Sequence, residues 1–245
     1  MGLRDRKSQT RRLNFGRIRR ARAPGTLDAV TTTEVRRRQR RDWPILTGLF
    51  LLALVPSLAG AVRFTELTSG PERTADNARF LDLPLPVLLH IPSVTIFAIL
   101  GALQLAPRFR ARNRRWHRIS GRVVFAAGLV AAGSGLFMTA FQELPATDGS
   151  LLNTARYLVG TAMIVALVLG VRAARKRDFH RHRAWMLRAY ALGLGAGTQV
   201  FTNIPLLILV PTGSPHYTDA RGLAMTAGWV INIAVAEHLI RRRRA

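Results

Sequence analysis

Two histidines, each followed shortly by an arginine, have the residue types and spacing that could bind haem. His117 is followed by Arg122 and His182 by Arg188, and each histidine stands at the start of an apolar stretch. Histidine is an axial ligand of haem iron, and the planar guanidinium of arginine suits a carboxylate such as a haem propionate. If the two stretches face each other within a membrane, these four residues predict a b-type haem site with both histidines on the iron.

The same residues also have a structural interpretation. Glu237 lies near the end of the last apolar stretch and could neutralise Arg122, Arg188 or both, because an unpaired charge within a membrane is costly. Such a pair would hold helices together. Histidines beside arginines at the membrane boundary could likewise contact lipid headgroups or begin helices. The sequence leaves both interpretations open.

Five further polar residues interrupt the apolar stretches and are candidate interior residues: His90, Gln104, Gln199, Asn203 and Asn232. His90 stands among prolines, and we expect its ring to bond a helix carbonyl that a proline leaves free. We expect the amides to join helices by hydrogen bonds, although they could instead line a site for a quinone or another small solute. His180 and His182 have no adjacent cysteine or carboxylate, so we do not expect a zinc site.

Six apolar stretches are long enough to carry these residues across a membrane. About 20 apolar residues cross the bilayer core as a helix, and lipid leaves helices as the expected form. The stretches are 43–62, 83–106, 117–141, 151–171, 182–210 and 218–240. We therefore predict an all-α fold, a polytopic membrane bundle with six transmembrane helices.

Arginine and lysine fall almost entirely on alternate sides of these stretches. The first 41 residues carry 14 basic side chains, residues 107–118 and 172–183 carry six each, and residues 241–244 carry four. Cytoplasmic loops hold such an excess, so both termini are expected in the cytoplasm of a bacterial cell, with the protein in the inner (plasma) membrane. The net charge of +24 then indicates contact with anionic lipid headgroups, and nucleic acid is not the expected partner.

The sequence divides into three parts with different expected roles. Residues 1–41 read as a basic, disordered cytoplasmic arm, 42–240 as the transmembrane domain and 241–245 as a basic tail. The chain has no cysteine, which excludes disulfides, thiolate metal sites and cysteine nucleophiles. No phosphate-binding loop, His-Glu-x-x-His or Gly-x-Ser-x-Gly motif is present, so any chemistry must occur within the bundle or at its inner rim.

Glycines mark the expected helix contacts. Gly193 and Gly197 are four residues apart in the fifth stretch, and the third stretch carries Gly121, Gly128, Gly133 and Gly135. Small residues let membrane helices approach closely. The third and fifth stretches also begin alike, with a histidine 11 residues before a glycine in both, which is consistent with an internal repeat that would bring His117 and His182 face to face.

Four strings together resemble a family of uncharacterised bacterial membrane proteins, a domain of unknown function. They are residues 90–104, 116–122, 180–188 and 232–237, and the resemblance covers about residues 45–240. The resemblance implies a multi-pass architecture and a membrane location, and it implies no activity.

Three functions remain as hypotheses. The first is electron transfer assisted by a b-type haem on His117 and His182. The second is a carrier for a small solute or lipid that uses the interior amides. The third is a non-catalytic membrane scaffold.

Overall fold

The computed structural model describes residues 42–74 and 77–242, and these residues form helices and no strands. The basic arm and most of the basic tail lie outside the described residues. The helices are α2 (Asp42–Thr68), α3 (Ala78–Asp82), α4 (Pro84–Leu105), α5 (Pro107–Arg112), α6 (Arg114–Phe141), α7 (Ser150–Arg175), α8 (Phe179–Gly193), α9 (Gly195–Thr202), α10 (Ile204–Leu209) and α11 (Tyr217–Arg241). The prediction of an all-α membrane helix bundle is confirmed.

Within the described residues, five single helices are long and apolar enough to cross a membrane, namely α2, α4, α6, α7 and α11. The fifth predicted stretch, 182–210, is not one straight helix. Its residues belong to α8 and to the segment Gly195–Leu209, which meet at a bend of 46°. Counting this bent pair as one span gives the six expected crossings.

The bend in the fifth span begins where α8 ends, and a side chain of another helix bonds to the backbone beside it. α8 ends at Gly193, and the Leu194 backbone N–H still donates to the Tyr190 carbonyl. The Ala191 carbonyl accepts a hydrogen bond from the Asn232 side chain, with a Nδ2 to O distance of 3.1 Å. A carbonyl in lipid must find a partner, so the α11 amide stabilises the break.

The prolines of the second span lie mostly where a helix tolerates them. Pro84 begins α4 and Pro86 falls in its first turn, where the missing N–H has no helical partner to lose. Only Pro92 lies inside the helix. The cluster of prolines therefore marks a helix start as much as a kink.

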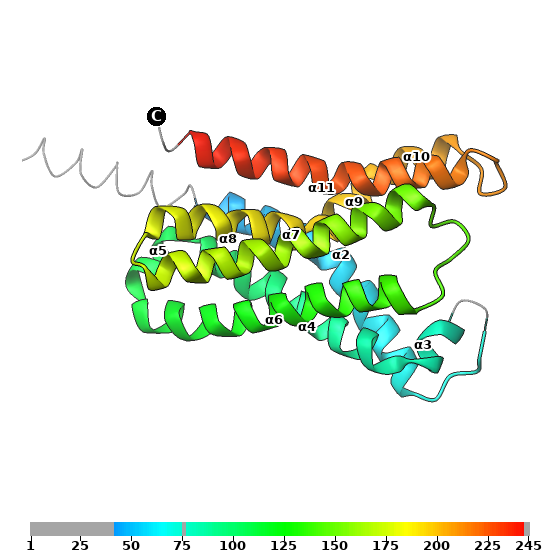
Figure 1. Ribbon diagram of the computed structural model, residues 1–245, viewed down its shortest axis with the longest axis horizontal. Helices are drawn as coiled ribbons and strands as arrows, with labels where there is room; N and C mark the ends of the chain where they lie inside the picture. Colours follow the sequence, from blue (N-terminus) through cyan, green and yellow to red (C-terminus); the bar gives the residue numbers. More distant parts are fainter. Residues whose placement is uncertain (1–41, 75–76, 243–245) are drawn as a thin grey trace, which may run out of the picture. The chain divides into compact units, whose positions relative to one another are not determined.

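The helices pack in a definite pattern that Figure 1 makes visible. α4 lies beside α6, α7 lies between α6 and α8, α11 covers α7, α8 and α9, and α2 contacts α4 and α9. One end of the bundle carries α5 and the turn between α7 and α8, and we call it the arginine-rich end (Figure 1). The opposite end carries α3 and the 142–149 loop, and we call it the α3 end.

The core is built from small residues with a few large side chains between them. Ala102 and Ala189 are fully buried, as is Leu167. A Cβ at Gly128 would lie 2.8 Å from Phe97 Cε2, so the α4 ring packs directly on the α6 backbone. Gly128 therefore lets two helices approach closely, as expected. Gly133 does not, because a Cβ there would meet no atom within 4 Å.

Candidate functional site

The two histidines of the predicted haem site lie at the arginine-rich end, in the first turns of α6 and α8. Both are half-buried. His182 Nδ1 lies 2.8 Å from the Gly170 carbonyl, which can only accept, so Nδ1 carries the proton. His117 Nδ1 is buried and has no partner within the described residues.

The two arginines predicted beside them are placed differently. Arg188 forms a double hydrogen bond with Glu237, with Nε to Oε1 at 2.5 Å and Nη2 to Oε2 at 3.0 Å. Its guanidinium also lies 4.7 Å from the centre of the Trp185 ring. The pairing considered as the structural interpretation is therefore present for Arg188.

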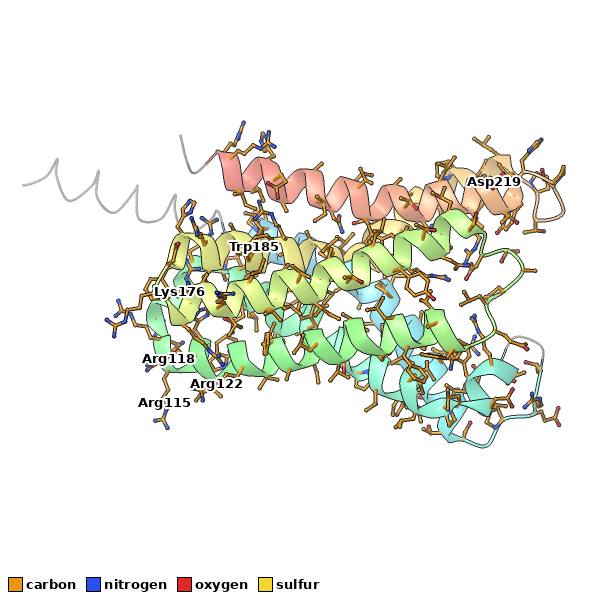
Figure 2. The ribbon with its side chains drawn as sticks, viewed as in Figure 1. Arg115, Arg118, Arg122, Lys176, Trp185 and Asp219 are labelled. Carbon is orange, nitrogen blue, oxygen red and sulfur yellow. The ribbon has the colours of Figure 1, made fainter. Side chains whose placement is uncertain are left out.

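Arg122 is exposed on α6 and forms no ion pair within the described part of the chain. Figure 2 shows it with Arg115 and Arg118 toward the outer edge of the bundle. The interior of the bundle thus holds one of the two arginines, and that one already has a carboxylate.

The interior amides join elements, as expected. Gln104 Nε2 donates to Ser120 Oγ at 2.6 Å and links α4 to α6. Asn232 bonds Ala191 and also accepts from Thr198 Oγ1, with O to Oδ1 at 2.7 Å. Gln199 Nε2 donates to the Met225 carbonyl of α11 at 3.0 Å. Asn203 Nδ2 donates to the Gln199 carbonyl one turn earlier at 2.7 Å and reaches α11 at Met225 Sδ, 3.2 Å away.

His90 has a different partner from the one expected. Its Nδ1 lies 2.9 Å from the Ala131 carbonyl and 3.0 Å from Ser134 Oγ, both on α6. A carbonyl freed by Pro92 would lie one turn back on α4, so the expectation was wrong. The ring reaches across because α6 has a glycine there: a Cβ at Gly135 would lie 3.3 Å from the His90 Cε1 atom.

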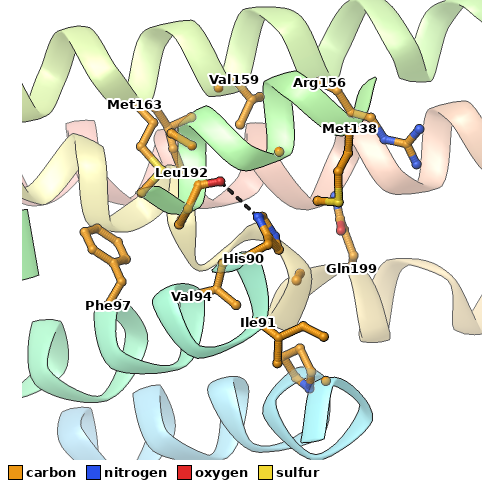
Figure 3. A pocket seen from close by; sticks show the side chains of 18 of the residues that line it. His90, Ile91, Val94, Phe97, Met138, Arg156, Val159, Met163, Leu192 and Gln199 are labelled. Atoms are coloured by element: carbon orange, nitrogen blue, oxygen red, sulfur yellow. Dashed lines mark hydrogen bonds between the residues drawn. The ribbon is translucent and has the colours of Figure 1, made fainter. Parts of the chain in front are cut away.

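A cavity of about 470 Å³ lies between the helices, displaced toward the α3 end. Its lining comes from α2, α3, α4, α6, α7, α8, α9 and α11, and most of the lining side chains are apolar. Figure 3 shows the His90 ring in the middle of this lining, with Phe97 and Met163 to one side and Arg156 and Met138 to the other. Gln199 also lines it.

A shared carboxylate holds the α3 end of the cavity together. Asp148 has a side chain that is only 2% exposed, and it pairs with Arg156 at 2.7 Å and with Arg221 at 2.8 Å. This joins the 142–149 loop to α7 and α11. One carboxylate against two guanidiniums leaves one positive charge in the group, and Arg156 is the member that lines the cavity.

A second ion pair at the α3 end lies outside the predicted spans. Arg73 Nη2 lies 2.8 Å from Asp82 Oδ2 on the surface. This hydrogen bond lowers the pKa of the Asp82 carboxyl below its ordinary value. The pair fixes the segment before α3 and takes no part in the cavity lining.

Sequence reasoning missed the cavity and Asp148. The glycines were the one sequence signal that could have indicated the cavity. Five of them line it: Gly60, Gly135, Gly160, Gly193 and Gly197. Glycines four apart were assigned to close helix packing alone. Asp148 lies in a loop, and Arg156 is the one partner that is near it in the sequence. Its second partner, Arg221, is 73 residues away.

Histidine, aspartate and glutamate do not gather in groups of three or more suited to a metal ion anywhere in residues 42–74 and 77–242. His180, two residues before His182, is exposed. A bis-histidine haem needs only two protein ligands, but α7 lies between α6 and α8, the helices that carry His117 and His182.

Comparison with known proteins gives one match. The family described as "Predicted membrane protein (DUF2306)" matches residues 87–240, from the second turn of α4 to the last turn of α11. The match covers the cavity-lining parts of α4, α6, α7 and α11 and both histidines of the arginine-rich end. No curated protein and no solved structure matches the chain.

Proposed function

Because the chain belongs to the DUF2306 family of predicted membrane proteins, whose function is unknown, we propose a function from the geometry of its own residues. The protein binds a small, largely apolar molecule in the cavity between its helices and acts as its carrier in the membrane. This is the small-solute or lipid carrier hypothesis, with the cavity in place of the amides as the main binding surface.

One observation carries this proposal, namely the size and lining of the cavity. Its volume of about 470 Å³ lies within the range of about 300–1,000 Å³ that is usual for small-molecule sites. Such sites combine apolar walls with a few polar groups that orient the ligand, and here Phe97 and Met163 supply the former and His90 and Arg156 the latter.

Filling the cavity is expected to abolish binding. Val94 lines the cavity and is half-buried, so Val94→Trp would place an indole where the ligand lies. Wild-type protein extracted from membranes and analysed by mass spectrometry is expected to carry a defined apolar molecule, and Val94→Trp to carry about tenfold less of it. The control is Val165→Trp on α7, which is 47% exposed and outside the lining. Equal ligand content in wild type and both variants would contradict the proposal.

The orientation and location of the bundle are part of the same proposal. The positive-inside rule assigns the arginine-rich end to the cytoplasm of a bacterial inner membrane, so the cavity would lie toward the outer half of that membrane. Exposed arginines such as Arg115, Arg118 and Arg122 would then meet anionic lipid headgroups.

A second candidate function, electron transfer with a b-type haem, has one specific observation in its favour. The hydrogen bond from His182 Nδ1 to the Gly170 carbonyl leaves Nε2 of that ring as the nitrogen that could ligate iron. His117 Nδ1 has no partner in the described residues but is enclosed by protein atoms, so this ring would also have to ligate through Nε2. Propionates would need partners other than Arg188, which holds Glu237, and they would meet Arg122 only at the surface.

A visible spectrum tests the haem candidate. Protein expressed with ample haem is expected to show Soret and alpha bands in a reduced-minus-oxidised spectrum, and a His117→Ala, His182→Ala double variant is expected to lose both. His180→Ala is the matched control, because this exposed histidine is two residues from His182 and is expected to leave the bands unchanged. Folded wild type without the bands would eliminate this candidate, and the absence of bound small molecules as well would leave the scaffold hypothesis.

A further inference from the structure

The hydrogen bonds of His90 determine which of its ring nitrogens carries the proton. The Ala131 carbonyl can only accept, so Nδ1, at 2.9 Å, must donate to it. Ser134 Oγ is also 3.0 Å from Nδ1 and lies 2.6 Å from the Val130 carbonyl, to which it gives its own proton. Ser134 therefore accepts from His90 as well. Both contacts hold the neutral ring in the form that has its hydrogen on Nδ1.

The other ring nitrogen, Nε2, is then a bare acceptor. No hydrogen bond joins it to any residue in the described part of the chain. Protein atoms enclose the unpartnered Nδ1 of His117, but they do not enclose Nε2 of His90 in this way. Because the His90 ring lines the cavity, Nε2 is an acceptor that a molecule in the cavity can reach.

The surroundings of this acceptor restrict the donor that can pair with it. A charged ammonium group is disfavoured, because Arg156 and Arg79 also line the cavity and the walls around the ring are apolar. An uncharged hydroxyl group supplies one O–H donor without bringing a charge. An acceptor in an apolar site also discriminates strongly against a molecule that lacks the donor, because the acceptor is then left unpaired.

We propose that the molecule bound in the cavity is an apolar alcohol or phenol whose hydroxyl donates a hydrogen bond to His90 Nε2. The inference rests on the proposed function, since it names the chemical class that the same cavity accepts. The alkyl or aryl part lies against Phe97, Met163 and Leu192, and the hydroxyl lies at the ring.

Two probes of nearly equal shape test the hydroxyl. 4-Octylphenol has the donor, and 4-octylanisole replaces its hydrogen with a methyl group. Each is titrated into the full chain in lipid nanodiscs, and affinity is measured from the shift in thermal unfolding, with concentrations expressed per volume of membrane. Wild type is expected to bind the phenol about tenfold more tightly than the ether, the factor that one hydrogen bond in an apolar site supplies.

Two substitutions at His90 separate its two nitrogens. The amide of His90→Asn can take the place of Nδ1 and keep the bond to Ala131, but it reaches no further, so the acceptor at Nε2 is lost. The amide of His90→Gln can place an oxygen near the Nε2 position. We expect the preference for the phenol to disappear in His90→Asn, with both probes still bound, and to persist in His90→Gln.

The outcomes distinguish this inference from the function it rests on. Saturable binding of both probes with equal affinity by wild type would overturn the hydroxyl while leaving the cavity as a binding site. A preference that survives in folded His90→Asn would show that another residue holds the hydroxyl and would overturn the role of His90. Failure of wild type to bind either probe would overturn the hydroxyl class and the cavity proposal together.

Discussion

Gly197→Ala is expected to separate α2 from α9 and to lower the thermal unfolding temperature by about 6–12 °C. A Cβ at this position would overlap the backbone carbonyl oxygen of Leu52 and lie 2.8 Å from Leu52 Cγ. A backbone atom cannot turn aside as a side chain can, so α2 must shift as a whole. Overpacking of a core usually costs about 1–3 kcal/mol, and a cost of about 3 kcal/mol corresponds to this change in temperature for a chain of this size.

Gly133→Ala is the matched control for this prediction. Gly133 also lies within a membrane-spanning helix, but a Cβ there would meet nothing within 4 Å. Alanine favours the helix by about 1 kcal/mol over glycine, so Gly133→Ala is expected to leave the unfolding temperature unchanged or to raise it slightly. Equal losses in the two variants would mean that α2 does not pack on α9 as described here.

The effect of Gly197→Ala should extend to the cavity. α2 contributes Ala53, Pro56, Ser57 and Gly60 to the lining, and Gly197 itself also lines the cavity. A shifted α2 would enlarge the cavity and open it to lipid. The variant is therefore also expected to lose the bound molecule, whereas Gly133→Ala is expected to keep it.

Glu237→Ala is expected to destabilise the protein by about 3 kcal/mol, the lower part of the range for breaking a buried pair. The substitution leaves the Arg188 guanidinium without its carboxylate inside the bundle, where the two side chains are 25% and 28% exposed. Most of the cost comes from the unpaired charge and not from the lost attraction. Thermal unfolding of the purified variant measures it.

A double substitution tests that explanation. Arg188→Met with Glu237→Met removes both charges and keeps apolar bulk, and replacing a whole buried pair in this way is often neutral. We expect the double variant to unfold close to the wild-type temperature and well above Glu237→Ala. A double variant as unstable as the single one would show that the attraction between the two groups, and not the unpaired arginine, sets the effect.

The sequence predicted the partner of Arg188 but not the partner of Gly197. The partnership of Arg188 and Glu237 could be foreseen, because few charges interrupt the apolar stretches and opposite charges there must find each other. Gly197 was recognised as a contact residue from its spacing with Gly193, but its neighbour was not, since Leu52 lies 145 positions earlier in the chain. Spacing within one helix carries no information about which other helix approaches.

Errors in the sequence interpretation share one origin. His90 was assigned a carbonyl on its own helix and instead bonds α6, and Arg122, which was treated as an intramembrane polar group, is exposed on α6. Both assignments required the rotation of a helix about its axis. In a segment that is apolar all round, the hydrophobic pattern hardly restricts that rotation, because lipid and neighbouring helices are equally apolar.

The sequence by itself determined that this protein is a bundle of apolar helices and where five of its six predicted stretches lie, because lipid admits few alternatives to a helix and hydropathy is read residue by residue. It also determined the uneven placement of arginine along the chain. Only the tertiary structure decided what the helices enclose: the cavity, the bare nitrogen of His90 and the carboxylate of Asp148 shared by two arginines. These features depend on how each helix is rotated and shifted against the next, and contacts between distant residues set that arrangement.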